Sequence, residues 1–312
     1  MALPVYASPL ERLWHYAYIV ICAAIFVFLV APILVVLPLS FNVEPYFTFT
    51  EKMLAFDPAG YSMRWYDNLL TDGMQAPEAV RDSAWWSDVW TNATWVKAAK
   101  NSLIIGFWAT ILATFLGTLA ALGLSRPDMP YRRVIMAILI SPMIVPIIII
   151  ATGLFFFYSS PCGMIGLDCG RLTATYIGII MAHATLGIPF VIITVTATLS
   201  GFDQSLIRAS ASLGANPRIT FFKVILPLIL PGVISGGLFA FVTSFDEVVA
   251  VLFIAGPEQQ TIPRQMWNGI REAISPAILA VATILVIFSI LLLTTLELLR
   301  RRSERLRGVT PG

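Results

Sequence analysis

Residues 208–217 read Arg-Ala-Ser-Ala-Ser-Leu-Gly-Ala-Asn-Pro and lie between two strongly apolar stretches of the chain. The composition of residues 204–213 favours a short helix, and Gly214 is the residue type that commonly ends a helix in a left-handed turn. Asn216-Pro217 can begin a second short helix, because proline is tolerated in the first helical turn. The sequence therefore predicts two short polar helices joined by a tight turn, with the second helix running into the next apolar stretch.

The composition of the whole chain indicates a membrane protein. Hydrophobic residues make up 58% of its 312 residues and charged residues only 12%, and the mean hydropathy is +0.82. A water-soluble domain cannot cover its surface with so few charges, whereas the bilayer core is itself apolar. The net charge of +2 is too small to indicate binding to nucleic acid.

Six apolar stretches are each long enough for the ~20 helical residues that cross a ~30 Å hydrocarbon core. We expect the first to stay in the membrane rather than to be removed as a signal peptide. Internal prolines such as Pro142, Pro146 and Pro189 are tolerated where neighbouring helices satisfy the freed carbonyl groups. The predicted fold class is therefore all-α, with six transmembrane helices at residues 16–39, 102–124, 134–158, 173–199, 228–254 and 277–299.

The distribution of basic residues predicts the orientation. Short loops rich in Lys and Arg stay in the cytoplasm, whereas long loops are translocated largely regardless of charge. With six spans both termini share a side, which collects twelve of the 20 basic residues: Arg12, Arg126, Arg132, Arg133, Arg208, Arg218, Lys223, Arg300, Arg301, Arg302, Arg305 and Arg307. We therefore expect a cytoplasmic N-terminus at residues 1–15, a transmembrane domain at 16–302 and a cytoplasmic tail at 303–312. Within that domain, 41–99 is an outer loop and 200–222 is cytoplasmic.

The outer loop at residues 41–99 is rich in aromatic residues. Trp and Tyr favour the headgroup zone of a bilayer, where the ring is half wet. We expect short helices there that lie on the outer surface of the membrane, and a substrate-binding aromatic cage is the alternative. The residues concerned are Trp65, Tyr66, Trp85, Trp86, Trp90 and Trp95.

Cys162 and Cys169 lie in a short outer loop between glycines. The outer face of a bacterial inner membrane is oxidising, so a disulfide between them is one reading, and two free thiols are the other. Cys22 lies inside the first span and reads as a small apolar filler. With only His15 and His183 in the chain, we expect no metal site.

The sequence lacks the motifs of nucleotide hydrolysis. No Gly-Lys dipeptide occurs, so the chain has no phosphate-binding loop of the Gly-Lys-[Ser/Thr] type, and it has no Gly-x-Ser-x-Gly turn. We expect no enzymatic activity and no cofactor bound by this chain. If ATP drives the protein, ATP and Mg²⁺ bind to another subunit.

Residues 208–227 resemble the cytoplasmic coupling loop of ABC importer permeases. That pattern is Glu-Ala-Ala, three residues and Gly, followed about nine residues later by hydrophobic-x-Leu-Pro. Here Arg208 replaces the Glu and Ser210 the second Ala. The resemblance implies coupling to a separate ATPase, and a solvated amphipathic connector is the alternative. The implied coupling residues are Arg208, Ala209, Ser210, Leu213, Gly214, Pro217, Phe221, Leu226 and Pro227.

Further matches cover residues 16–302. Asn101-Ser102-Leu103, His183 with Pro189-Phe190, and Ser244-Phe245-Asp246-Glu247 resemble the second permease of spermidine/putrescine-type ABC importers. Residues 71–94 look like an insertion. The resemblance implies the type I importer fold, a bacterial inner membrane, two ATPase subunits, a second homologous permease and a periplasmic solute-binding protein. It implies a polyamine as solute, with an opine, an amino-acid-like or another small solute as the alternative.

Asp246 and Glu247 are the most unusual residues within any predicted span. A carboxylate in hydrocarbon is costly and normally faces protein or a wet cavity. Near the outer end of its helix, the pair could attract a cationic solute, so Asp246, Glu247, Phe245 and His183 are candidate pathway residues. An ion pair with Arg264 or Arg271, or headgroup exposure, is the alternative. An ion-coupled carrier is less favoured, because the two halves of the chain show no convincing repeat.

Overall fold

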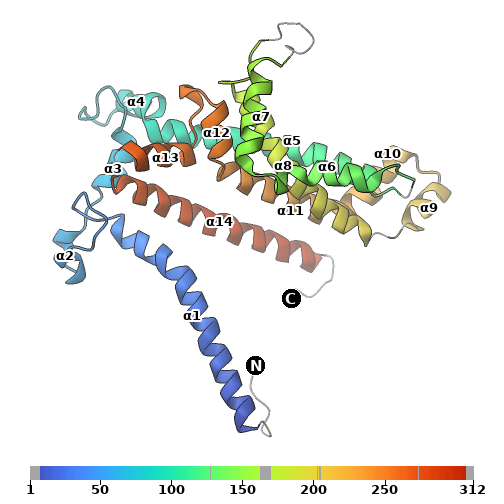
Figure 1. Ribbon diagram of the computed structural model, residues 1–312, viewed down its shortest axis with the longest axis horizontal. Coiled ribbons are helices and arrows are strands. Elements are labelled where there is room, and N and C mark those ends of the chain that lie inside the picture. Colours follow the sequence, from blue (N-terminus) through green and yellow to red (C-terminus); the bar gives the residue numbers. More distant parts are fainter. Residues whose placement is uncertain are drawn as a thin grey trace. The chain divides into compact units, whose positions relative to one another are not determined.

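The computed structural model describes residues 8–126, 128–161, 170–201, 203, 205–272 and 274–306, the last twelve by their backbone alone (Figure 1). Across these residues the regular structure is helical, apart from one isolated β-bridge between Asn42 and Tyr61. The predicted all-α fold class is therefore confirmed. The chain divides into two compact units, Met1–Val80 with Gly269–Gly312, and Arg81–Asn268.

The first unit is built on two long helices. The longer is α1 (Pro9–Leu39), where Ser8 and Glu11 form a reciprocal capping box at the first turn. The other is α14 (Ala277–Leu306), which packs against α1 and α3. Trp65 of α3 donates its indole N–H to the Asn42 carbonyl at 2.8 Å. The short elements between them are α2 (Glu51–Leu54), the 3-10 helix η1 (Pro58–Gly60) and α3 (Arg64–Thr71).

The second unit is a helical bundle whose core is the packing of α5, α8 and α11 on one another. Small residues allow this contact. A Cβ added at Gly117 would lie 2.6 Å from the Val191 Cβ, and one added at Gly236 would lie 2.7 Å from the Val191 Cα. The helices are α4 (Ser83–Asn92), α5 (Thr94–Leu124), α6 (Arg132–Ile144), α7 (Ile147–Ser159), α8 (Tyr176–Ser200), α9 (Ser205–Ser212), α10 (Pro217–Thr220), the π-helical turn η3 (Phe221–Ile225), α11 (Leu226–Phe245), α12 (Val249–Ile254), the 3-10 helix η4 (Pro257–Gln259) and α13 (Ile262–Glu272), whose last turn belongs to the first unit.

Five helices among the described residues are long and apolar enough to cross a membrane, or six if one bent helix pair counts as a span. That pair is α6 and α7, which meet at 103° (Figure 1). The predicted third span at residues 134–158 is thus not one straight helix. Val145 is extended because it precedes a proline, and Pro146 has no N–H to continue the helix.

The predicted fifth span at residues 228–254 is also interrupted. The helix ends at Phe245, and the chain turns through residues 246–248 before α12 begins. The Glu247 carboxylate accepts a hydrogen bond from the Ala250 N–H, so the side chain takes up a donor of the first turn of α12. This hydrogen bond caps the start of the new helix.

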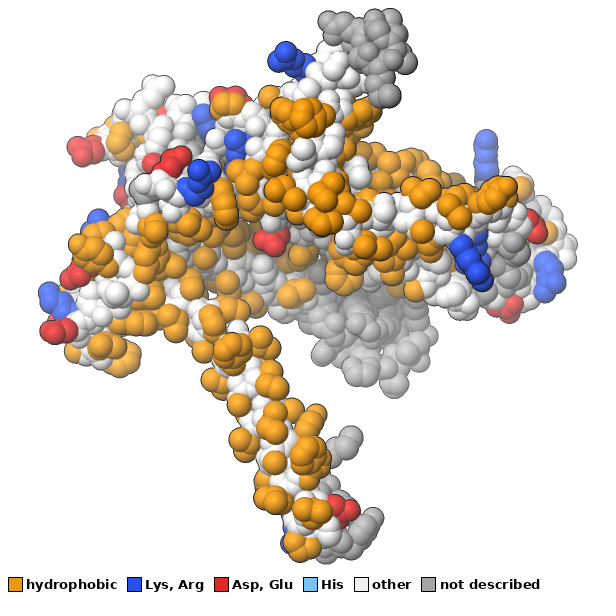
Figure 2. All heavy atoms as spheres, viewed as in Figure 1, with side chains coloured by type: hydrophobic (Ala, Val, Ile, Leu, Met, Phe, Trp, Pro, Cys, Tyr) orange, Lys and Arg blue, Asp and Glu red, His pale blue; other side chains and the backbone are white. Residues whose placement is uncertain are grey.

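Residues 41–99, the predicted outer loop, contain the short helices α2, α3 and α4, but the tryptophans of this part of the chain divide into two groups. Trp65, Trp85 and Trp95 are buried within their units, whereas Trp86 and Trp90 are exposed on α4. The expectation of headgroup anchors was therefore wrong for the three buried rings. Figure 2 shows hydrophobic side chains along the whole length of α1, whose side chains between Tyr18 and Leu29 are largely exposed.

Candidate functional site

The turn after α9 has the geometry of a helix C-cap. Gly214 donates its N–H to the Ala211 carbonyl at 2.9 Å, and Ala215 donates to the Ser210 carbonyl at 3.1 Å. This pair of bonds is the Schellman pattern, which satisfies the last carbonyls of a helix. The helix, the glycine stop and the following helix were all predicted from the sequence and are confirmed.

Gly214 has φ +76°, in the left-handed region. A Cβ added there would meet no atom within 4 Å. The requirement for glycine is therefore conformational and not a matter of space, since a β-branched side chain is strained at this φ whatever surrounds it.

Ser210 and Thr220 join α9 to α10. Their side-chain oxygens lie 3.0 Å apart, and both residues are buried. Ser210 also donates to the Ile207 carbonyl at 2.8 Å. Ser210 is one of the predicted coupling residues, and its side chain lies inside the loop, where it holds the two helices together.

Asn216 begins α10 as predicted. Its side-chain oxygen accepts the Ile219 N–H at 2.9 Å, which is a standard N-cap. The chain then passes through η3, where the Leu226 N–H donates to the Phe221 carbonyl five residues earlier. Such π-helical turns inside helices are frequent at functional sites. α9, α10 and η3 form one compact unit, residues 205–225, which we call the coupling knob.

The outer surface of the coupling knob is apolar and basic. Leu213 is 88% exposed at the turn, and Phe222 is 64% exposed on η3. Arg208, Arg218 and Lys223 are also exposed. Figure 1 shows α9 and α10 at one end of the second unit, and Figure 2 shows Lys and Arg side chains at that end. Of the predicted coupling residues, Ala209 and Pro217 are exposed as well, and Phe221 and Leu226 are half-buried.

Asp203 precedes α9 and stabilises its start. Its carboxylate accepts the Ser205 hydroxyl at 2.6 Å and the Ser205 N–H at 2.8 Å. These hydrogen bonds, with a smaller contribution from the charge of Arg208, lower the pKa of Asp203 below its ordinary value. The carboxylate is therefore ionised at neutral pH and engaged with its own helix.

A second polar group joins α8 to α11. The His183 Nδ1 and the Ser244 Oγ are 2.7 Å apart, and His183 is almost completely buried. Shortly after Ser244 in the chain, the Glu247 side chain is buried, whereas the Asp246 side chain is exposed. Of the two predicted pathway carboxylates, only Asp246 is thus open to solvent or a solute.

Glu247 and Arg264 lie at opposite ends of α12. Glu247 accepts the Ala250 N–H at 2.9 Å, and Arg264 donates to the carbonyls of Val251 and Ala255 at 3.1 and 2.9 Å. A negative group at the N-terminus and a positive group at the C-terminus both oppose the helix dipole. The sequence left open an ion pair between Glu247 and Arg264. In the structure these two side chains instead cap the two ends of one short helix.

Asn101 and Ser102 hold the segment that follows α12. Asn101 donates to the carbonyls of Glu258 and Gln260 at 2.8 and 2.9 Å and accepts the Tyr176 hydroxyl at 2.7 Å. The Ser102 Oγ accepts the Ile262 N–H at 2.9 Å. In the sequence, Asn101 and Ser102 were noted only because they match the permease family, and no structural role was predicted for them. The available signal was an amide and a hydroxyl at the start of an apolar span.

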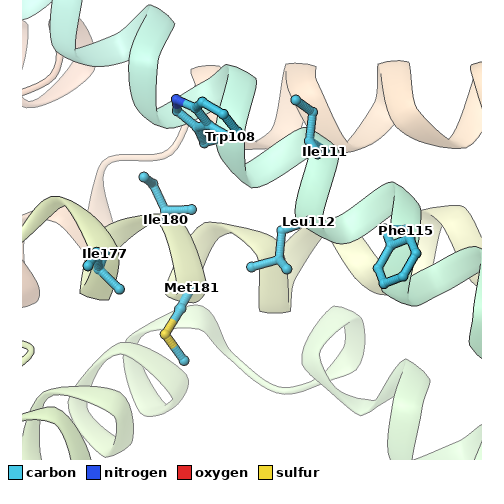
Figure 3. Close-up of a pocket in the computed structure, with 7 residues that line it drawn as sticks. All are labelled: Trp108, Ile111, Leu112, Phe115, Ile177, Ile180 and Met181. Carbon is cyan, nitrogen blue, oxygen red and sulfur yellow. The ribbon is translucent and has the colours of Figure 1, made fainter.

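The second unit carries a hollow of about 380 Å³, and Figure 3 shows the side chains that line it. Side chains from α5 and α8 line it, and all of them are apolar. A cationic solute would find no polar partner in this lining. The hollow is formed by Trp108, Ile111, Leu112, Phe115, Ile177, Ile180 and Met181.

The possible disulfide cannot be compared with the structure. Cys162 and Cys169 lie outside the described residues, so their pairing stays open. Within the described part of the chain, no three His, Cys, Asp or Glu side chains gather as a metal site would require.

Residues 113–306 match the family described as the binding-protein-dependent transport system inner membrane component. The chain belongs to this family. It is therefore a multi-pass inner-membrane permease of a binding-protein-dependent ABC importer, a transport subunit and not an enzyme.

Similarity to individual proteins extends over most of the chain. The putrescine transport system permease protein PotI of Escherichia coli is 33% identical over 91% of this chain and 88% of its own length. The spermidine/putrescine transport system permease protein PotC of Haemophilus influenzae is 28% identical over 90% of this chain and 95% of its own length. A crystal structure of a bacterial ABC transporter involved in the import of the acidic polysaccharide alginate has a TM-score of 0.63 at 17% identity, and the match covers 96% of this chain and 99% of that chain. The last similarity confirms the predicted fold.

Proposed function

We propose that this permease belongs to an importer of small polyamine-like cations and that an ATPase drives it through the coupling knob. The observation that carries the choice of solute is the similarity, over about 90% of the chain, to permeases named for spermidine and putrescine. The same resemblance brings the expected partners: two ATPase subunits, a second homologous permease and a periplasmic solute-binding protein. ATP and Mg²⁺ bind to the ATPase subunits.

The coupling knob fits the task of force transmission because it is held together internally. The Schellman turn, the Asn216 cap and the Ser210–Thr220 bond satisfy its polar groups without a partner. Leu213 and Phe222 remain exposed and can enter a groove on the ATPase. Large apolar side chains that fill pockets commonly dominate binding energy at interfaces.

Movement of the knob reaches the membrane helices through η3, which continues directly into α11. The close packing of α11 on α5 and α8, at Gly236 and Gly117 among others, makes these three helices move together. Closure of the ATPase pair on ATP would then rock the bundle from inward-open to outward-open, and hydrolysis would reset it. Such alternating access needs packed helices and no covalent chemistry.

Asp246 is the residue we assign to the cationic solute. It is exposed, and it directly follows Phe245, whose ring stacks on Phe241 with centroids 5.6 Å apart. An exposed carboxylate attracts an ammonium group by its charge, and aromatic rings attract one by cation–π interaction. Glu247 and His183 support this region from inside: the first caps α12, and the second fixes α8 to α11.

Reconstitution of the complete transporter with its binding protein tests the proposal. Spermidine, putrescine, an opine, a neutral amino acid and sulfate are offered separately, and uptake and ATP hydrolysis are measured. We expect both activities to rise with the polyamines. Stimulation by sulfate, the opine or the neutral amino acid alone would contradict the choice of solute and leave the permease family unaffected.

A further inference from the structure

We propose that the groove receiving the coupling knob on the ATPase is apolar at its centre and acidic at its rim, with a carboxylate that pairs with Arg208. This inference rests on the proposed coupling function. It concerns the partner's surface chemistry, which the family resemblance alone does not supply, because the usual pattern has Glu where this chain has Arg208.

The charge of the knob is one-sided. Residues 205–225 contain Arg208, Arg218 and Lys223 and no acidic residue. All three basic residues are exposed. A partner surface of the same sign would be repelled, whereas an acidic one would be attracted and oriented during encounter.

Asp203, which lies just before the knob, can offset at most one of these three positive charges, so the surface stays net basic. The Asp203 carboxylate accepts two hydrogen bonds from Ser205, and these are the larger causes of its lowered pKa. The charge of Arg208 is the smallest contributor. The Arg208 guanidinium is exposed, and its planar donor fork suits a bidentate contact with a carboxylate of another subunit.

The apolar residues indicate a protein groove rather than lipid headgroups. Leu213 is 88% exposed at a turn whose backbone is fixed by two hydrogen bonds, and Phe222 and Ile219 are exposed on the neighbouring helical turns. Rigid apolar side chains surrounded by charges match the usual anatomy of an interface, with an apolar core and a polar rim.

Carbodiimide crosslinking of the purified transporter tests for the carboxylate. The reagent joins a lysine amine to a carboxylate in contact with it, forming an amide while the reagent becomes a urea, and it leaves arginine unreacted. Lys223→Arg removes the knob's own lysine and serves as background. In that background Arg208→Lys should give a permease–ATPase product, and Arg171→Lys should not, because Arg171 precedes α8 and the knob follows it.

Charge reversal gives the quantitative result. We expect Arg208→Glu to lower the ATPase retained by the purified permease complex roughly tenfold, and retention by the wild type to fall as salt is raised. Arg171→Glu makes the same change of charge at the other end of α8 and should leave retention unchanged.

The outcomes separate the two proposals. If the wild-type complex retains no ATPase, the proposed coupling function is wrong. If it retains ATPase that is insensitive to Arg208→Glu and forms no carbodiimide product, the acidic groove is wrong and the coupling function stands. A third outcome is that Arg208→Glu leaves ATPase retention unchanged but removes the stabilisation that phosphatidylglycerol nanodiscs give to the permease. That result would show that the basic residues bind lipid, and it would also overturn the acidic groove.

Discussion

The coupling knob and the segment around α12 are both polar interruptions between apolar helices, yet they use their charged residues in opposite ways. In the knob, small uncharged side chains such as Ser210 and Thr220 face inward, and the charged Arg208 faces outward. Around α12, the charged groups of Glu247 and Arg264 form hydrogen bonds with backbone groups at the two ends of one short helix. A charge in an apolar sequence therefore indicates function only once its partner is known.

The largest effect is expected at the turn of the knob. Gly214→Val places a β-branched residue at φ +76°, which costs about 1–3 kcal/mol, and we expect uptake to fall by roughly fivefold to a hundredfold. Gly153→Val is the matched control, because a Cβ there also meets nothing within 4 Å and φ is not positive. Gly214→Asn should retain much of the activity, since asparagine tolerates the left-handed region. Normal uptake by Gly214→Val would remove the turn from the mechanism.

Asp246 and Glu247 test the difference between an exposed carboxylate and one that caps a helix. Asp246→Asn should reduce polyamine uptake per assembled transporter by roughly threefold to tenfold, through lost attraction of a cation. Glu247→Gln should leave that ratio unchanged, because an amide oxygen can still accept the Ala250 N–H. Uptake is normalised to the assembled complex measured by gel filtration. Equal losses for both variants would mean that exposure does not distinguish their roles.

The hydrogen bonds of Asn101 to the segment after α12 should contribute to the stability of the protein. Asn101→Ala removes hydrogen bonds to Glu258, Gln260 and Tyr176 and should lower the unfolding midpoint of the purified complex by roughly 5 °C. Asn92→Ala removes a single bond to Asp88 and is the control. A midpoint unchanged by Asn101→Ala would show that this network does not hold the segment.

The smallest effect is expected inside the knob. Ser210→Ala, Thr220→Val and the double variant form a thermodynamic cycle for the side-chain bond between α9 and α10. We expect a coupling free energy of about 1 kcal/mol from the unfolding midpoints. Additive effects of the two single variants would show that the 3.0 Å contact contributes nothing to the knob's rigidity.

Local signals explain what could be predicted from the sequence. Gly214 and Asn216-Pro217 specify their turn and cap through their own backbone preferences, so the two-helix knob was predictable. The apolar stretches likewise predicted the helical spans by length and composition. Each of these features depends on residues close together in the chain.

Features that depend on tertiary contacts were not predictable in this way. The burial of Ser210 requires Thr220 from the next helix, and the burial of Trp85 and Trp95 requires the packing of the bundle. The cap at the start of α12 depends on how the Glu247 side chain folds back onto the Ala250 N–H. The bend at Pro146 had a visible signal, but prolines elsewhere, such as Pro189, remain inside a continuous helix.

The central claim is that the coupling knob is the contact with the ATPase, and Leu213 tests it most directly. In a background in which the native cysteines of the permease are replaced, Leu213→Cys in the ATPase-bound transporter is labelled with maleimide-benzophenone. The maleimide adds to the cysteine thiol, and on illumination the benzophenone bonds to a C–H group of a neighbouring protein. We predict a permease–ATPase product for Leu213→Cys and none for Ser210→Cys, which is buried, or for Arg171→Cys at the other end of α8. Retained ATPase that links to Arg171→Cys and not to Leu213→Cys would contradict the account.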